Sequence, residues 1–251
     1  MILLIRQILF NIVFYGATTV FCIVLTPAML LPRSVFIIGL NAYFKSVHLI
    51  EKYILGLDFE VRGKEYIPTT GSFLVAAKHY SAYETMKLHL LFSDPAIIMK
   101  KELSRIPLWG WLAMKARMIF IDRGSREVAL SSIIAGAKRV EAEGRPLVIF
   151  PQGTRVAIDE TPDQKPYKGG IIRMYESTHQ PILPLAMNSG LYWKKNAFFK
   201  YPGKVIFEFL PPIPPGMKGS EVLAQLQNAL EKKSNELVQI ALKEENTSHD
   251  I

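Results

Sequence analysis

Ser-Phe-Leu-Val-Ala-Ala-Lys-His-Tyr-Ser-Ala-Tyr-Glu, residues 72–84, is the stretch that decides the fold. The apolar run at 72–77 predicts a buried strand, and Ser81 followed three positions later by Glu84 is typical of the capping box that starts a helix. His79 then lies in the loop between strand and helix. Ligands in open α/β sheets collect at the carboxyl ends of strands, so this order favours an α/β fold with a site beside His79. On these residues alone, a capping glutamate beside an ordinary loop histidine explains the pattern equally well.

Two later apolar runs each end in an arginine. Residues 117–122 lead to Arg123, and residues 147–150 lead through a short loop to Arg155. Both runs are predicted strands, so the two guanidinium groups are expected at one edge of the sheet. A guanidinium offers a planar fork of N–H donors that matches phosphate oxygens. Each arginine alone is compatible with a surface ion pair, but the two beside the histidine loop predict a phosphate pocket.

Neighbours of the second arginine extend this predicted pocket. Gly153 and Thr154 would let backbone N–H groups approach an anion closely. Lys168, which precedes Gly169-Gly170, is a further candidate for a phosphate contact, although a surface lysine fits its position equally well.

With these motifs the chain resembles the glycerolipid acyltransferase superfamily, and within it the bacterial 1-acyl-sn-glycerol-3-phosphate (lysophosphatidic acid) acyltransferases. The family's first motif is a histidine with an acid five residues later, here His79 and Glu84. Its second, Gly-x-x-Phe-Ile-Asp-Arg, corresponds to residues 117–123, and its third, Phe-Pro-Glu-Gly-Thr-Arg, corresponds to residues 150–155. Its fourth, a proline-centred apolar strand, corresponds to residues 182–186. The order and spacing of all four agree, which makes the resemblance specific.

The chain departs from the family pattern at three positions. Glu84 replaces the usual aspartate with a side chain one methylene longer, so the loop must absorb the added length. Gln152 replaces a glutamate, which keeps hydrogen bonding but removes the charge, and we expect it only to position substrate. Arg117 replaces a glycine, which removes backbone freedom and adds a cation whose effect the sequence leaves open.

The resemblance implies an enzyme of phospholipid biosynthesis. It implies acyl transfer from acyl-CoA or acyl-carrier protein to the sn-2 hydroxyl of lysophosphatidic acid, giving phosphatidic acid, with no metal and no cofactor beyond the acyl donor. His79 is the expected general base and Glu84 the acid that orients it. The expected phosphate-binding residues are Arg123, Arg155, Gly153, Thr154 and Lys168, and the expected substrate-positioning residues are Gln152 and Ser81.

Two other functions remain open from the sequence. One is acylation of another lysolipid, such as lyso-ornithine lipid. The other is a catalytically silent, membrane-tethered lipid-binding protein, which the substitutions at Glu84 and Gln152 suggest. Phosphate dependence separates the first from the main prediction, and binding without turnover identifies the second.

The N-terminal part predicts a membrane element. No residue from Gln7 to Pro32 is charged, and the next apolar stretch, 34–50, is interrupted only by Lys45. At about 1.5 Å per helical residue the first stretch can cross a hydrocarbon core of about 30 Å. It exceeds a typical signal-peptide core, and arginines flank it on both sides, so charge assigns no orientation. A span stays open, but the family resemblance favours a hairpin in one leaflet of the cytoplasmic (inner) membrane, with the catalytic domain facing the cytoplasm.

Composition agrees with one enzyme domain plus this element. The 251 residues are 49% hydrophobic, and 30 Lys and Arg against 22 Asp and Glu give a net charge of +8. That charge favours anionic partners, and we expect a membrane surface and a phosphorylated substrate rather than nucleic acid, for which no motif is present. Residues 1–56 are the predicted hairpin and residues 57–251 the predicted acyltransferase domain. Alternating strands and helices predict an α/β fold with a mixed, largely buried β-sheet flanked by helices.

Overall fold

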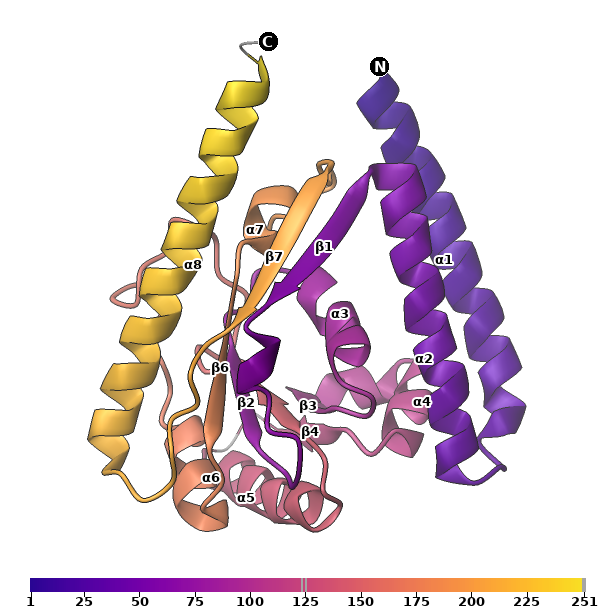
Figure 1. Ribbon diagram of the computed structural model, residues 1–251. Helices are drawn as coiled ribbons and strands as arrows, with labels where there is room; N and C mark the ends of the chain where they lie inside the picture. Colours follow the sequence, from indigo (N-terminus) through magenta and orange to yellow (C-terminus); the bar gives the residue numbers. More distant parts are fainter. Residues whose placement is uncertain (123, 125, 250–251) are drawn as a thin grey trace.

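A computed structural model describes residues 1–122, 124 and 126–249 of the chain. Within these residues, seven strands form one sheet in the order β1-β7-β6-β2-β5-β3-β4 (Figure 1). The strands are β1 (Leu57–Arg62), β2 (Leu74–Ala77), β3 (Ala96–Lys100), β4 (Ile119–Ile121), β5 (Leu147–Ile149), β6 (Ile182–Met187) and β7 (Gly203–Phe209).

The sheet is mixed and its centre is buried. β6 and β7 run antiparallel, whereas all the other neighbouring strands run parallel. Every residue of the central strands β2, β5 and β6 is buried. Strands covered on both faces read as continuous apolar runs rather than alternating ones, which is the pattern at residues 72–77. The predicted α/β fold with a mixed, largely buried sheet is confirmed.

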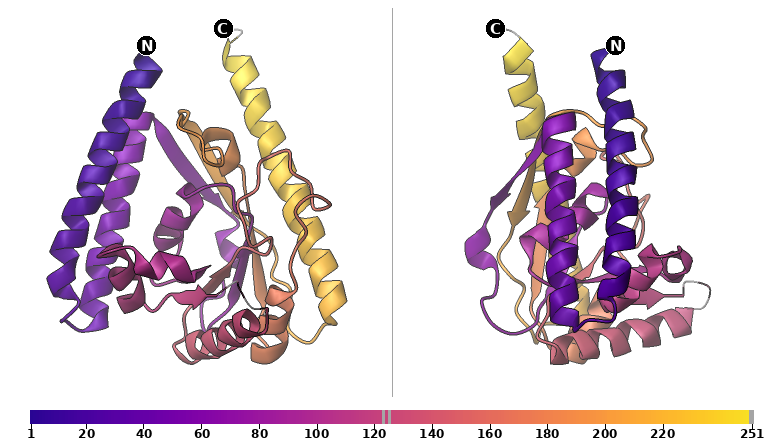
Figure 2. Two further views of the ribbon diagram at one scale, coloured as in Figure 1. Left: turned by 180° about the vertical axis from the view of Figure 1, so that it is seen from behind. Right: turned by 90° about the vertical axis from the view of Figure 1, so that its right-hand side faces the viewer.

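Helices cover both faces of the sheet. The larger helices are α1 (Ile2–Ala28), α2 (Arg33–Ile50), α3 (Tyr83–Leu91), α4 (Trp109–Lys115), α5 (Arg126–Ala142), α6 (Gly170–Thr178) and α8 (Gly219–His249), and the shorter ones are η1 (Glu51–Leu55), η2 (Lys64–Tyr66), η3 (Lys101–Arg105) and α7 (Ser189–Tyr192). Figure 2 shows the α1–α2 pair and α8 on opposite sides of the molecule.

Alternate side chains of β2 enter two separate hydrophobic cores. Leu74 and Ala76 pack in the core beneath α5, α6 and α8. Val75 and Ala77 pack in the core beneath α1, α2 and α3. This period of two is a property of the extended strand, and it places the loop after β2 between the two layers of helices.

The α1–α2 hairpin is fixed to the sheet domain at both of its ends. At one end the buried amide of Gln7 donates to Lys200 O (2.8 Å) and accepts from Lys200 N–H (3.1 Å), while Arg6 donates to Ile54 O at 2.7 Å. At the other end Arg33 makes two 2.7 Å hydrogen bonds to the Asp94 carboxylate. Arg33 therefore binds the sheet domain, and Arg6 binds η1, the segment that joins the hairpin to β1.

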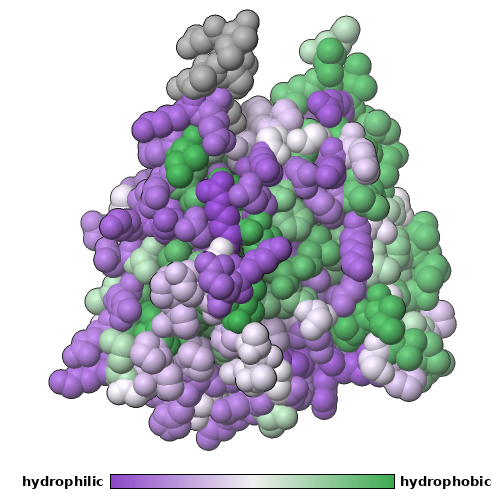
Figure 3. Space-filling model, viewed as in Figure 1, coloured by the Kyte–Doolittle hydropathy of each residue, from purple (hydrophilic) through white to green (hydrophobic). Residues whose placement is uncertain are grey.

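The outer face of α1 is apolar and exposed. Among the described residues, α1 is the one helix long and apolar enough to cross a membrane, judged by length and composition. Only 17% of its apolar window is buried inside the structure. Figure 3 shows the contrast with α8, where hydrophilic residues dominate. The exposed apolar residues of α1 include Ile2, Ile5, Ile12, Val20, Ile23 and Val24.

Two local predictions differ from the structure. The run 117–122 contributes a strand only from Ile119, because Arg117 adopts a left-handed conformation (φ 58°) that ends the turn after α4. The start of α3 is also displaced from the simple capping box. Ser81 Oγ accepts from the Tyr83 N–H at 3.1 Å, one residue earlier than that motif requires, while Glu84 accepts from the Ser81 N–H as expected.

Candidate active site

His79 and Glu84 meet where β2 ends and α3 begins. The distance from His79 Nδ1 to Glu84 Oε1 is 2.7 Å. A carboxylate only accepts hydrogen bonds, so Nδ1 carries the proton and Nε2 is left as the proton acceptor. The hydrogen bond is thus formed despite the extra methylene of Glu84.

Glu84 is completely buried and its carboxylate accepts five hydrogen bonds. Oε1 accepts from His79 and from the N–H groups of Tyr80 (2.6 Å) and Ser81 (2.7 Å). Oε2 accepts from the hydroxyls of Ser81 and Ser189, each at 3.2 Å. These bonds fix the carboxylate and with it the orientation of the imidazole. Ser189, which sequence reasoning missed, comes from the short helix α7, far along the chain.

The His79 ring lies against the ring of Phe150, the residue that follows β5. Their centroids are 4.1 Å apart and their planes differ by 19°. On the other side of the loop, His79 O accepts from the Val156 N–H at 2.7 Å. The histidine loop is thus held against the 150–155 loop, as the shared sheet edge predicts.

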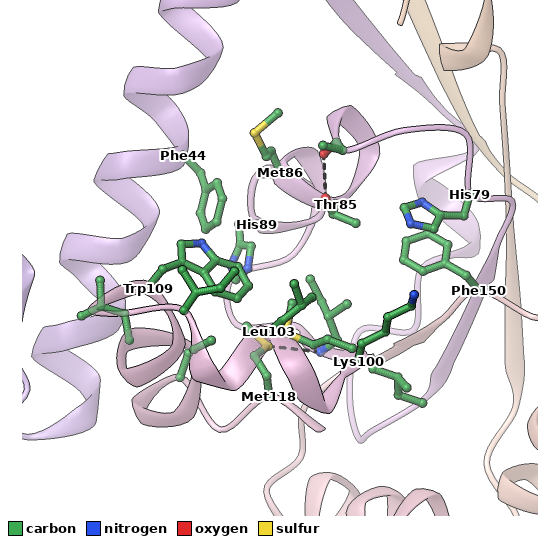
Figure 4. Close-up of a pocket in the computed structure, with 18 of the residues that line it drawn as sticks. Phe44, His79, Thr85, Met86, His89, Lys100, Leu103, Trp109, Met118 and Phe150 are labelled. Carbon is green, nitrogen blue, oxygen red and sulfur yellow. Dashed lines mark hydrogen bonds between the residues drawn. The ribbon is translucent and has the colours of Figure 1, made fainter. Parts of the chain in front are cut away.

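A cavity of about 510 Å³ opens beside His79 and extends between the hairpin, α3 and α4. Figure 4 shows His79 and Phe150 on one side of this cavity, and Phe44, His89 and Trp109 on the opposite side. Most of its lining is apolar, with side chains from α1, α2, α3, β3 and α4. Such a space suits a hydrocarbon chain whose reacting end lies beside His79.

Three cationic side chains line the cavity. Two of them, Arg155 and Lys168, are among the predicted phosphate-binding residues, and the backbone N–H of Lys168 donates to Pro151 O at 2.9 Å, which ties this lysine to the 150–155 loop. Lys100, the last residue of β3, lies on the same side of the cavity as His79 (Figure 4). Lys100 was not among the predicted residues, yet it follows the same rule as the arginines, an apolar strand that ends in a cation. Arg123 lies outside the described residues.

The other predicted residues of the 150–155 loop differ from one another in exposure and in contacts. Gly153 lines the cavity with φ +69°, a conformation that favours glycine, and its N–H closes the turn by donating to Phe150 O at 2.8 Å. Thr154 is exposed. Gln152 is 3% exposed and donates to Lys165 O at 3.1 Å, so it holds the loop that leads to Lys168.

Neither Ser81 nor Arg117 lines the cavity. Ser81 is buried, and its hydroxyl donates to Glu84 Oε2. Arg117 is half-exposed and pairs with Glu143 at 2.8 Å. The extra cation that replaces the family's glycine is thus paired with Glu143, the residue after α5, and its left-handed backbone still has the conformation for which glycine is suited.

The described site can bind and activate a hydroxyl group. The His79 imidazole lines a cavity beside positive charge, and the buried Glu84 can stabilise the imidazolium that forms on proton uptake. The cavity offers room for an apolar chain, and the cations offer binding to an anionic group. This combination is what transfer of a fatty acyl group to a phosphorylated acceptor requires.

Comparison with known proteins agrees with this chemistry. The profile of the family described as Acyltransferase matches residues 58–188, more than half of the chain. The 1-acyl-sn-glycerol-3-phosphate acyltransferase of Pseudomonas aeruginosa is 28% identical over 201 residues, which cover 80% of this chain and 77% of the relative. The alpha form of that enzyme from Mus musculus is 30% identical over 165 residues, covering 64% of this chain and 57% of the relative.

A solved structure has the same fold. The crystal structure of the 1-acyl-sn-glycerophosphate (LPA) acyltransferase PlsC from Thermotoga maritima aligns with a TM-score of 0.76, covering 93% of this chain and 96% of that chain, at 23% identity. The matched profile runs from β1 to the end of β6 and includes His79, Glu84 and the cationic loops. By that match, and with its histidine-acid contact formed, the chain belongs to the acyltransferase family.

Proposed function

We propose that this protein transfers a fatty acyl group from acyl-CoA or acyl-carrier protein to the sn-2 hydroxyl of lysophosphatidic acid, giving phosphatidic acid. One observation carries the proposal: the bonded His79–Glu84 pair lies at one end of an apolar cavity, beside three cations. The names of the relatives from bacteria, yeast and mammals support the same reaction.

The chemistry follows from the position of the imidazole. Nε2 of His79 takes the proton from the acceptor hydroxyl as its oxygen attacks the thioester carbonyl carbon. The carbon–sulfur bond then breaks, and the imidazolium returns the proton to the leaving thiolate. Glu84 stabilises the transient imidazolium and keeps Nδ1 protonated, so that Nε2 always faces the acceptor.

Arg155, Lys100 and Lys168 bind the acceptor phosphate in this proposal. Arg155 supplies a two-pronged contact, and the lysines add charge from the segment that follows the 150–155 loop and from β3. A phosphate held there brings the glycerol hydroxyl toward His79, since Arg155 is next to Val156, which bonds the His79 carbonyl.

The α1–α2 hairpin attaches the enzyme to one leaflet of the membrane, with the catalytic domain on the cytoplasmic side of the inner membrane. The exposed apolar face of α1 supports attachment. The contacts of Gln7 and Arg33 with the sheet domain support a hairpin that stays beside the domain. In a Cys22→Ser background, single cysteines at positions 2 and 60 should react with an impermeant reagent from the same side. Reaction from opposite sides contradicts the hairpin.

The intact histidine-acid contact supports catalysis over a silent binding protein. The direct test offers the purified protein a panel of lysolipid acceptors in mixed micelles, with acyl-CoA and acyl-carrier-protein donors. Phosphatidic acid formed from lysophosphatidic acid, at a rate well above that with phosphate-free acceptors, is the expected result. Turnover with lyso-ornithine lipid alone, or binding of lysophosphatidic acid without turnover, contradicts the proposal.

A further inference from the structure

We infer that His89 selects a fatty chain that carries a hydrogen-bonding group, such as a hydroxyl, part-way along its length. The inference rests on the proposed function, in which a fatty chain fills the cavity. It concerns the end of the cavity opposite His79, where Figure 4 shows His89 beside Phe44 and Trp109.

His89 is a buried polar residue that the protein does not satisfy. Its side chain lines the cavity although the residue is only 6% exposed, and its Nδ1 atom has no hydrogen-bond partner among the described residues. Its ring stacks on Phe44, with centroids 4.1 Å apart and planes 7° from parallel. Stacking explains why an aromatic residue is present at this position, but phenylalanine would stack equally well. It does not explain why the ring carries nitrogen atoms.

The imidazole of His89 is neutral at ordinary pH. Burial lowers its pKa from 6.5 to about 3, with the Asp94 charge opposing and the Arg145 charge adding to that shift. A neutral imidazole has one N–H donor and one nitrogen acceptor. Such a ring can both donate to and accept from a hydroxyl group.

Two threonine hydroxyls that line the cavity already have partners. The Thr85 hydroxyl donates to Ala82 O at 2.6 Å. The Thr18 hydroxyl donates to Phe14 O at 2.7 Å and lies 3.1 Å from the Tyr43 hydroxyl. A buried water needs two to four polar partners. The neighbours of His89 shown in Figure 4 are aromatic and aliphatic. Nδ1 is enclosed by the protein, so a ligand in the cavity meets the ring at Nε2, which also has no hydrogen-bond partner among the described residues.

The position of His89 along α3 defines where on the chain that group would be. Ala82, Thr85, Met86 and His89 all line the cavity, and their spacing marks one face of the helix. Seven residues separate Ala82, at the His79 end, from His89, which corresponds to about 10 Å of helix. A chain that reacts beside His79 therefore reaches His89 well before its terminal methyl group.

The consequence is a preference for the substituted chain. A site with a buried polar group rejects the analogue that lacks the matching group, because the protein atom is then left unpaired in a dry cavity. We expect a donor with a correctly placed hydroxyl to exceed the unsubstituted donor of equal length by about tenfold or more in kcat/KM.

The test compares hydroxystearoyl thioesters, with the hydroxyl at successive mid-chain positions, against the stearoyl thioester. The hydroxylated and plain chains are placed first on the donor and then on the lysophosphatidic acid acceptor, so the arm that responds identifies which chain occupies the cavity. His89→Phe, which keeps the stacking on Phe44, is expected to reduce the preference to near unity. Met86→Leu, on the same face of α3, is the matched control and should change both rates by a similar factor.

Failure of this inference differs from failure of the proposed function. If the parent protein acylates lysophosphatidic acid but prefers the plain chain in both arms, or if His89→Phe keeps the full preference, the inference is overturned and the function stands. If no donor gives turnover, the proposed function fails, and competition of hydroxystearic acid and stearic acid for the parent cavity still decides the inference. Tighter binding of the hydroxy acid supports it, and equal or weaker binding refutes it.

Discussion

The two ends of α3 treat buried polar groups in opposite ways. Glu84, in the first turn, is fully buried and receives five hydrogen bonds from the protein. His89, in the last turn, is nearly as buried, yet its Nδ1 has no partner among the described residues. A polar group that the fold satisfies is fixed in place before any ligand arrives. The fold supplies no hydrogen bond to the His89 ring, so its accessible nitrogen, Nε2, gains a partner only from what binds in the cavity.

The cavity beside α3 has the same asymmetry. Its His79 end combines an oriented base with Arg155 and Lys100, whereas its far end is built from aromatic and aliphatic side chains. A lysolipid and an acyl thioester have the same division into a charged, reactive part and an apolar chain. The His79 end, called here the prepared end because the protein already positions its polar groups, should therefore determine the rate. The far end beside His89, called here the open end, should determine which chain is used.

The largest effect is expected at the prepared end. His79→Ala removes the base that is hydrogen-bonded to Glu84 and lines the cavity. It should lower kcat by about 10²- to 10⁴-fold. Binding of lysophosphatidic acid should change little, because the cations remain. Kinetics and equilibrium binding in the same micelles measure both. Turnover within tenfold of the parent protein contradicts the assigned role of His79.

Glu84→Gln tests whether the acid acts by charge or only by position. The amide oxygen can occupy the place of Oε1, and its NH₂ group can donate to the Ser81 and Ser189 hydroxyls, so the fold should be kept. The lost charge no longer stabilises imidazolium, and kcat should fall by about tenfold or more. An unchanged melting temperature with reduced kcat is the expected pair of results. Unchanged kcat reduces Glu84 to a helix cap.

Arg155→Ala tests the cationic part of the prepared end. Losing charge-assisted hydrogen bonds worth about 1.5–3 kcal/mol should reduce kcat/KM for lysophosphatidic acid by about ten- to a hundredfold. Lysine should rescue only part of this loss, because it lacks the bidentate fork. A phosphate-free acceptor, measured at the same surface composition, should be less affected. Equal losses for both acceptors mean that Arg155 supports the fold or binds the donor.

Burial of His89, in the last turn of α3, should affect the pH dependence of stability. Between pH 6.5 and about 3, an unfolded His89 binds a proton and the folded one does not, because burial lowers its pKa. The unfolded state then holds more protons, so acidification removes stability. The free energy of unfolding should fall faster for the parent protein than for His89→Phe, by up to about 1.4 kcal/mol per pH unit. Parallel curves over this range contradict the burial of an unpaired imidazole.

The smallest effect is expected at Arg117, outside the cavity. Arg117→Gly relieves a left-handed backbone (φ 58°) but removes the half-exposed ion pair with Glu143. Relief of the left-handed backbone is worth about 1–2 kcal/mol. The lost ion pair costs up to about 1 kcal/mol, and the added backbone entropy of glycine costs about 0.5–1 kcal/mol, so the melting temperature should hardly change. Activity should also be unchanged, because the side chain pairs with Glu143 and does not line the cavity. A large loss of activity would assign Arg117 a role in the site.

The residues that local patterns predict best are those whose neighbours are close in the chain. The strand at 74–77, the His79 loop and Glu84 follow from one short stretch, and all three lie as expected. Lys100 could have been found by the same reasoning that selected Arg155, since it ends an apolar strand.

The remaining features depend on distant contacts. Ser189 reaches Glu84 across 105 positions, and Gln7 reaches Lys200 across 193, so no local period could reveal either contact. Gln152 appeared to be a substrate contact because of its motif, yet its amide is used by Lys165 O. Likewise, the missing hydrogen bond at His89 Nδ1 can be recognised only when the positions of the neighbouring residues are known.

The central claim, that the prepared end of the cavity carries out acyl transfer to lysophosphatidic acid, has one most direct test. A single-turnover experiment mixes purified protein with lysophosphatidic acid and an acyl thioester, and mass spectrometry and thiol titration follow both products. The parent protein should form phosphatidic acid and free thiol in equal amounts, and His79→Ala should form neither at a comparable rate. Thiol release without phosphatidic acid, or equal rates for the two proteins, would contradict the account.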